Sequence, residues 1–187
     1  MSRTREQLER YLKTLDIKTG KILDVGGSQL PIRPRLKSCI AQEIKTYDLP
    51  VPHQTALRPD FTGDINVQHD IPYKADLIFC LEVFEYVYDP VTAIDNLAFW
   101  LNPGGKMIIS FPFVYPLHNP PTLDYLRYTE MGACKLLENG GFKIDSVFYR
   151  TAEDGALRGL YSYEGMKMAK NYDHHDAVGF IITCTKK

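Results

Sequence analysis

The chain alternates between short apolar runs and segments in which apolar residues recur every three or four positions. The first run, Lys21–Val25, contains a single acid, Asp24, and ends at Gly26 and Gly27. A short apolar run bounded by glycines is typical of a buried parallel strand that enters a tight turn. Similar runs predict further strands at Glu43–Tyr47, Phe61–Ile65, Ala75–Leu81, Lys106–Phe111, Lys143–Arg150 and Val178–Thr185.

Helical periodicity fills much of the sequence between these expected strands. An N-terminal helix within residues 1–16 is predicted to begin at the capping box Thr4–Gln7 and to cover the sheet or a ligand cleft. Asp89–Pro90 starts a second helix, and Thr129 caps a third. After the glycine turn, the segment Pro31–Pro34 shortens or breaks the helix that would otherwise be expected there.

This order of elements indicates a fold class. Strands that alternate with helices form βαβ units, and therefore a parallel sheet with helices on both faces. Ligands bind such sheets at the carboxyl ends of the strands. Asp24, Asp48 and Asp64 each stand at or near the end of an expected strand. Three acids should therefore converge on one edge of the sheet, which is where we expect the binding site.

Composition restricts the class of protein. The 187 residues are expected to form a single domain, residues 1–187. The net charge of -1 argues against a nucleic-acid partner, because a nucleic-acid-binding face is normally basic. Four widely spaced cysteines without a Cys-x-x-Cys pair fit reduced thiols in the cytoplasm. The N-terminus does not resemble a signal peptide, and no apolar stretch is long enough to span a membrane.

The glycine turn is a candidate ligand site, because glycine permits positive φ and the close approach of a ligand. Asp24 would repel the pyrophosphate of a dinucleotide, whereas it would suit a sulfonium ligand with an α-ammonium group. The alternative is an ordinary turn in which Asp24 is only a capping residue. Asp48 is placed to accept hydrogen bonds from two ribose hydroxyls. The basic residues Arg33, Arg35 and Lys37 fit a solvated face better than an anion site.

Taken in order, the motifs resemble those of class I S-adenosylmethionine-dependent methyltransferases, of the small type related to the type-11 group. The similarity rests on Leu23–Gly26, Asp48, Gly63–Asp64, Asp70–Tyr73, Ala75–Tyr86 and Leu101–Lys106. The resemblance implies a Rossmann-like sheet of seven mostly parallel strands, with helices on both faces and an antiparallel last strand. It also implies S-adenosyl-L-methionine as the cofactor, bound by Asp24, Gly26, Gly27, Ser28, Asp48, Leu49, Asp64, Ile65, Leu81 and Glu82.

Two departures from the family pattern affect the expected site. The first motif usually has three glycines at alternate positions, and here Ser28 and Leu30 replace two of them. The family's Leu-Glu-His after the fourth strand is Phe84-Glu85-Tyr86 in this chain, so a phenol stands where relatives use a histidine. The turn and the pocket are therefore expected to differ in detail from those of relatives.

The acceptor is expected to contact the chain after the fifth strand. Pro112–Pro121 is rich in proline and aromatic residues, and Asp124–Thr129 resembles the Asp-Tyr-x-Arg-Tyr-Thr segment of many small methyltransferases. His118 is a candidate general base, because histidine titrates near neutrality, or else it packs on an aromatic neighbour. The other catalytic candidates are Tyr86 and Asp124, of which Asp124 is expected to pair with Arg127. The expected substrate-binding residues are Tyr115, His118, Tyr125, Arg127 and Tyr128.

The segment 151–177, between the last two expected strands, is long for a hairpin. Its tyrosines and methionines suggest a lid, a substrate wall or a homodimer contact. Within it, Asp173–Asp176 contains two adjacent histidines, but without further ligands we predict no metal site.

These observations predict methyl transfer to an oxygen or nitrogen of a small-molecule acceptor, with no nucleic-acid or membrane partner. Attack on a sulfonium methyl requires mainly orientation and a dry pocket. One alternative is a non-catalytic, methyltransferase-like binding or scaffolding protein. A less favoured alternative is a nicotinamide-dependent oxidoreductase, whose Gly-x-Gly-x-x-Gly spacing is absent.

Overall fold

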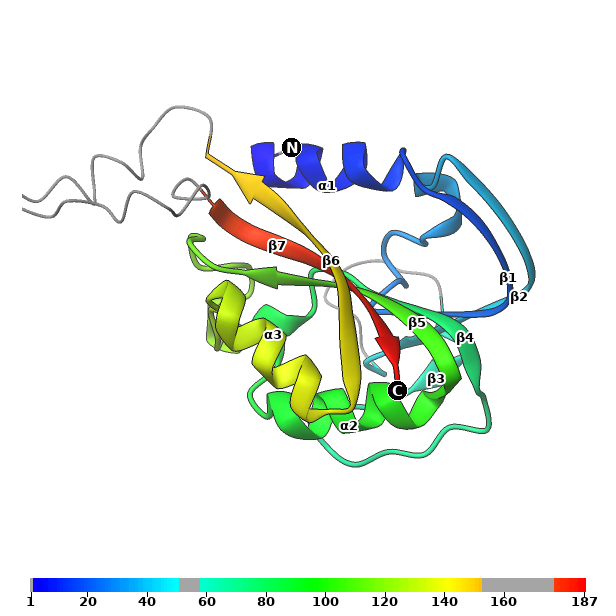
Figure 1. Ribbon diagram of the computed structural model, residues 1–187. Helices are drawn as coiled ribbons and strands as arrows, with labels where there is room; N and C mark the ends of the chain where they lie inside the picture. The colour runs from blue at the N-terminus through cyan, green and yellow to red at the C-terminus, as the bar shows by residue number, and fades with distance from the viewer. Residues whose placement is uncertain (1, 51–57, 153–176) are drawn as a thin grey trace, which may run out of the picture.

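The computed structural model describes residues 2–50, 58–152 and 177–187 and shows one seven-stranded sheet in the order β3-β2-β1-β4-β5-β7-β6 (Figure 1). Strand β7 runs antiparallel to both of its neighbours, and the pairs among the first five strands are parallel. The strands are β1 Asp16–Val25, β2 Ser38–Asp48, β3 Phe61–Thr62, β4 Ala75–Cys80, β5 Leu101–Pro112, β6 Phe142–Thr151 and β7 Ala177–Lys186. The predicted Rossmann-like sheet is confirmed.

Some strands extend beyond the apolar runs that predicted them, because their outer residues are exposed. In β1, the last four residues, Ile22–Val25, are buried, whereas the first six are exposed or partly exposed. The apolar run therefore marked only the inner half of the strand. The predicted third strand, Phe61–Ile65, is also too long, since only Phe61–Thr62 pairs with β2.

Helices cover both faces of the sheet, as predicted. Helix α1 (Arg3–Leu12) lies on one face, where Leu8 and Leu12 are fully buried against strand side chains such as Phe79. Helices α2 (Pro90–Trp100) and α3 (Glu130–Asn139) lie on the other face, as Figure 1 shows.

The helix ends follow from local side chains. The backbone N–H of Thr92 donates to Asp89 Oδ1 at 3.1 Å, and that of Gly132 donates to Thr129 Oγ1 at 3.1 Å, so both predicted caps are confirmed. The predicted capping box Thr4–Gln7 is wrong. The N-cap of α1 is Ser2, whose side chain accepts from the backbone N–H of Arg5.

The connections at the carboxyl edge are short and irregular. Between β1 and β2 there is only the 3-10 helix η1 (Arg33–Arg35), so the prolines do break the expected helix. Two further 3-10 helices are η2 (Phe84–Tyr86), after β4, and η3 (Pro121–Leu123), after β5. The predicted lid or dimer segment and Asp173–Asp176 lie almost wholly outside the described residues. No helix within the described ranges is long and apolar enough to cross a membrane.

Candidate functional site

A cavity of about 290 Å³ opens at the carboxyl ends of the parallel strands. This is the edge at which the sequence placed the ligand. The predicted cofactor residues that line it are Gly26, Asp48, Leu49, Asp64, Ile65, Leu81 and Glu82, and the predicted catalytic residues that line it are Tyr86 and His118. Segments after β1, β2, β3, β4 and β5 thus meet at one site.

Gly26 makes the tight turn at the end of β1. Its φ is +75°, and its N–H donates to the carbonyl of Tyr47 at 2.8 Å. A Cβ at this position would lie 2.5 Å from Val83 Cγ2. Both the backbone conformation and the packing therefore require glycine, which confirms that this turn depends on it.

Asp24 lies beneath the turn and not on the cavity wall. Its side chain is buried, and its Oδ2 accepts a hydrogen bond from the N–H of Ile32 at 2.7 Å. Burial raises the pKa of Asp24 to about 7, which the Ile32 hydrogen bond partly opposes. A Cβ on Gly27 would lie 2.1 Å from Asp24 Oδ2, so this glycine leaves room for the carboxyl. Asp24, Gly27 and Ser28 do not line the cavity, and Asp24 orders the loop.

Asp48 and Asp64 present carboxylates to the cavity. Asp48 Oδ2 accepts from the N–H of Ser28 at 3.2 Å, and its Oδ1 accepts from the N–H of Leu49 at 2.8 Å. Asp64 Oδ1 accepts from the N–H and the side-chain amide of Asn66. Each carboxylate retains lone pairs that could accept further hydrogen bonds from a ligand.

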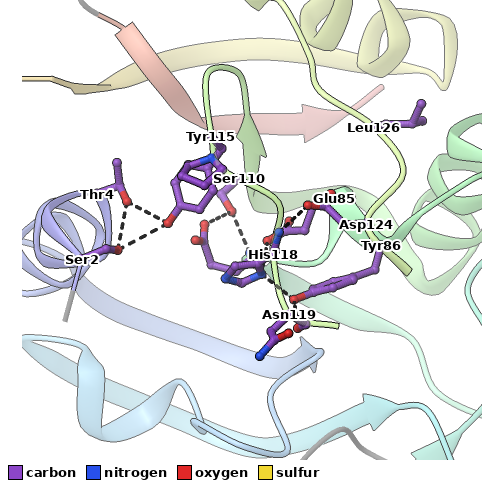
Figure 2. Close-up of polar contacts among 12 residues, drawn as sticks. Ser2, Thr4, Glu85, Tyr86, Ser110, Tyr115, His118, Asn119, Asp124 and Leu126 are labelled. Atoms are coloured by element: carbon purple, nitrogen blue, oxygen red, sulfur yellow. Dashed lines mark hydrogen bonds and ion pairs between the residues drawn. The ribbon is translucent and has the colours of Figure 1, made fainter. Parts of the chain in front are cut away.

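Glu82 is held in a strained conformation at the end of β4. Its φ is +57°, and its N–H donates to Ser110 Oγ at 2.8 Å. Glu82 Oε1 accepts from Ser110 Oγ at 2.9 Å and from Nη1 of the buried Arg150 at 2.8 Å (Figure 2 shows Ser110). Strain of this kind persists where the surrounding contacts enforce it, commonly at functional sites.

His118 is held at the cavity by a polar network (Figure 2). Its Nδ1 is hydrogen-bonded to the Tyr86 hydroxyl and lies 3.4 Å from Glu85 Oε1. Its backbone N–H donates to Asp124 Oδ2 at 2.5 Å. Burial, together with nearby carboxylates, raises the pKa of Tyr86 well above its usual value, so this phenol is a poor base.

Asp124 does not line the cavity. Its carboxylate is paired with the guanidinium of Arg127. Arg127 Nη1 donates to Asp124 Oδ1 at 2.5 Å, and Nη2 donates to Oδ2 at 2.6 Å. The predicted internal pair is therefore confirmed. Its effect is to fix the loop that carries His118.

The three tyrosines predicted to bind substrate do not line the cavity, although the Tyr115 ring lies edge-on to His118, 5.8 Å away between ring centroids. The Tyr115 hydroxyl contacts Thr4 Oγ1 at 2.8 Å and so joins the loop after β5 to α1 (Figure 2). Tyr125 packs edge-on against Tyr88 at 5.6 Å between ring centroids. Tyr128 is buried in the core. None of the three, and not Arg127, lines the cavity.

Two arginines that the sequence analysis did not assign to the site, Arg5 and Arg35, line the cavity. Arg35 Nη2 donates to Glu9 Oε1 at 2.8 Å, and Arg5 Nε donates to the same oxygen at 3.0 Å. The interpretation of Arg35 as part of a solvated face was wrong. The i,i+4 spacing of Arg5 and Glu9 is visible in the sequence, but their contact with Arg35 depends on how α1 packs on η1.

Glu85 is a further residue to which the sequence analysis assigned no role. It is 4% exposed, and its Oε2 has no hydrogen-bond partner within the described part of the chain. Burial, followed by the charge of Glu82, raises the pKa of Glu85 to about 8. The described ranges contain no group of three or more His, Cys, Asp or Glu side chains that could hold a metal.

Comparison with known proteins identifies the family to which this chain belongs. The methyltransferase domain family matches residues 2–132. An S-adenosylmethionine-dependent methyltransferase from Mesorhizobium loti is 15% identical, with a TM-score of 0.61, over 98% of this chain and 98% of that chain. The N-methyltransferase NodS from Bradyrhizobium japonicum is 15% identical, with a TM-score of 0.61, over 98% of this chain and 95% of that chain. No curated protein sequence matches the chain.

The structure of NodS with S-adenosyl-L-homocysteine is also similar, at 14% identity and a TM-score of 0.60, over 98% of this chain and 86% of that chain. The cavity offers carboxylates to hydroxyl and amino groups, and a guanidinium pair to a carboxylate, which fits the chemistry of S-adenosylmethionine. With the family match extending over more than half of its length, the chain belongs to the methyltransferase domain family, whose fold binds S-adenosylmethionine.

Proposed function

We propose that this protein transfers a methyl group from S-adenosylmethionine to an oxygen or nitrogen atom of a small-molecule acceptor. One observation carries the proposal. The same cavity contains the carboxylates of Asp48 and Asp64 on one side and the imidazole of His118 on another. A candidate cofactor site and a candidate proton acceptor therefore share one cavity.

The charges around the cavity suggest how the cofactor lies. Asp48 is suited to the two ribose hydroxyls, and Asp64 lies beyond it toward the adenine. Arg5 and Arg35 share the single carboxylate of Glu9, so this corner carries one net positive charge. We place the carboxylate of the cofactor's amino-acid end at these arginines, because opposite charges attract strongly in a partly enclosed site.

The bound cofactor would supply a methyl group that its sulfonium already activates. The protein then has to orient the acceptor and exclude water. For a hydroxyl acceptor, His118 would take the O–H proton while the oxygen forms its bond to the methyl carbon. The electron pair of the breaking carbon–sulfur bond remains on sulfur. A neutral amine acceptor would attack without that help.

Cofactor binding is tested by calorimetric titration with S-adenosylhomocysteine. Asp48→Ala should weaken binding by about 2–4 kcal/mol, because hydrogen bonds to a charged group are lost. Asp95→Ala, which removes an exposed acid from α2, is the matched control and should bind as the unaltered protein does. Circular dichroism establishes that both variants are folded. Unchanged affinity in folded Asp48→Ala would contradict the ribose assignment.

The acceptor class is tested by transfer of labelled methyl from S-adenosylmethionine to pooled small metabolites. Labelling of a metabolite would support the proposal. Cofactor binding without transfer to any pool would indicate the non-catalytic alternative, and strong labelling of RNA or DNA would overturn the small-molecule assignment.

A further inference from the structure

A buried carboxyl group lies behind His118 on the side away from solvent. Glu85 belongs to η2, directly after β4, and its side chain is almost fully buried. The carbonyl of Glu85 accepts a hydrogen bond from the N–H of Tyr125 at 2.7 Å, which fixes its backbone. Figure 2 shows Glu85, Tyr86 and His118 close together, and the mechanism proposed above uses only the histidine.

The hydrogen bonds around the ring identify its tautomer. The Tyr86 hydroxyl donates to the carbonyl of Asn119 at 2.9 Å. A hydroxyl has one proton, so when Tyr86 gives it to the Asn119 carbonyl, Tyr86 Oη accepts from His118 Nδ1. Glu85 Oε1 lies 3.4 Å from Nδ1, where its negative charge or lone pair also favours a proton on Nδ1. Both contacts favour the tautomer in which Nδ1 carries the ring proton and Nε2 carries the lone pair.

We propose that Glu85 is a positioning residue that, together with Tyr86, holds the proton of His118 on Nδ1 and so reserves Nε2 as the proton acceptor of the site. The inference deepens and rests on the proposed methyl transfer, in which His118 takes a proton from the acceptor. With Nδ1 already protonated, the acceptor's proton can go only to Nε2. The resulting imidazolium then has its Nδ1–H directed at the two oxygens.

The charges that face Glu85 suit this role. Glu82 on the preceding segment and Asp124 after η3 disfavour its ionisation, whereas Arg150 from β6 favours it. An ionised Glu85 has only acceptor oxygens, so in that state it favours a proton on the facing Nδ1. The ionised carboxylate also stabilises the positive charge of the imidazolium, 3.4 Å away. A buried oxygen without a partner, Oε2, is unusual in a carboxyl group that serves only the fold.

The test is nitrogen NMR of the full chain labelled with ¹⁵N-histidine, without ligand, at a pH where the imidazole is neutral. The chain has five histidines, and His118→Gln assigns the signal. The unaltered protein should show the Nδ1–H form of His118. Tyr86→Phe should keep that form, because Glu85 Oε1 still faces Nδ1 at 3.4 Å. Tyr86→Phe with Glu85→Leu should shift most of the population to Nε2–H, the form that imidazole prefers in water.

Two further variants separate this role from a packing role. Glu85→Gln with Tyr86→Phe keeps an amide oxygen near Nδ1 and should restore the Nδ1–H form. Glu138→Leu with Tyr86→Phe removes an exposed acid on α3 and should leave the Nδ1–H form unchanged. A switch to Nε2–H in Tyr86→Phe alone would overturn the inference, and this single variant decides the matter if the Glu85→Leu protein does not fold.

The measurement needs neither cofactor nor acceptor. A wrong tautomer would therefore overturn the role of Glu85 and leave the proposed methyl transfer to its own titration and transfer assays.

Discussion

Asp24 illustrates how one residue can be located correctly in sequence while its role stays open. The sequence places an acid directly before two glycines, which suits either a cationic ligand or a capped turn. The structure places the carboxyl under the loop, bonded to the N–H of Ile32. Gly27→Val is consequently a poor probe of ligand approach, because a side chain at Gly27 would collide with Asp24 before it met any ligand.

The buried Asp24 should make stability depend on pH. Burial raises its pKa in the folded chain to about 7, against an ordinary 3.8. Between these values the folded state binds more protons than the unfolded state, so the free energy of unfolding falls as pH rises from about 4 to about 7. The loss should be on the order of a few kcal/mol. Urea denaturation at several pH values measures it.

Asp24→Asn should reduce that slope, because an amide does not titrate but can still accept from the N–H of Ile32. The slope that remains reflects Glu85, whose pKa is also raised. Asp95→Asn, in which the changed acid is exposed, should keep the slope. Parallel slopes in the Asp24→Asn and unaltered proteins would contradict the burial argument.

At the scale of elements, α1 has two functions that its amphipathic sequence only partly indicates. Its apolar side packs Leu8 and Leu12 against the sheet, as the periodicity predicts. Its polar side brings Arg5 to the cavity and joins Tyr115 through Thr4. The helix thereby connects the glycine-turn region to the loop after β5, which no local pattern indicates.

If the amino-acid end of the cofactor lies at α1, Arg5→Gln should weaken S-adenosylhomocysteine by about 1.5–3 kcal/mol, the usual range for a hydrogen bond to a charged group. Binding of 5′-methylthioadenosine, which has no carboxylate, should be unchanged by the same substitution. Calorimetry on both ligands measures the difference. Arg10→Gln is the control, because Arg10 is on the same helix but does not line the cavity. Equal losses for both ligands would show that Arg5 acts only through the fold.

At the scale of the whole molecule, the sheet order brings distant strands to one polar cluster. Strand β7 lies between β5 and β6, and Arg150 of β6 reaches across β7 and β5 to Glu82 at the end of β4. Gly179 of β7 makes room for this, since a Cβ there would lie 2.9 Å from Arg150 Nη2. The antiparallel insertion of β7 therefore determines both the sheet edge and the charge balance near Glu85.

Breaking this buried ion pair should be costly. Arg150→Met should lower the free energy of unfolding by about 3–5 kcal/mol, because Glu82 would be left buried without its cation. Arg10→Met is the matched control, since Arg10 lies 3.9 Å from Glu6 with both side chains largely exposed. That exposed pair should contribute at most about 1 kcal/mol. Similar urea midpoints for the two variants would contradict the importance of the buried pair.

The sequence by itself determined the succession of strands and helices along the chain, because elements buried on one or two faces have apolar residues at regular spacings. It also determined that Asp48 and Asp64 meet at the carboxyl edge, since parallel strands all end there. Tertiary structure alone decided which side chains complete the cavity. Arg5, Arg35 and Glu85 reach it or its histidine through packing between elements far apart in the chain, and no short spacing encodes such contacts.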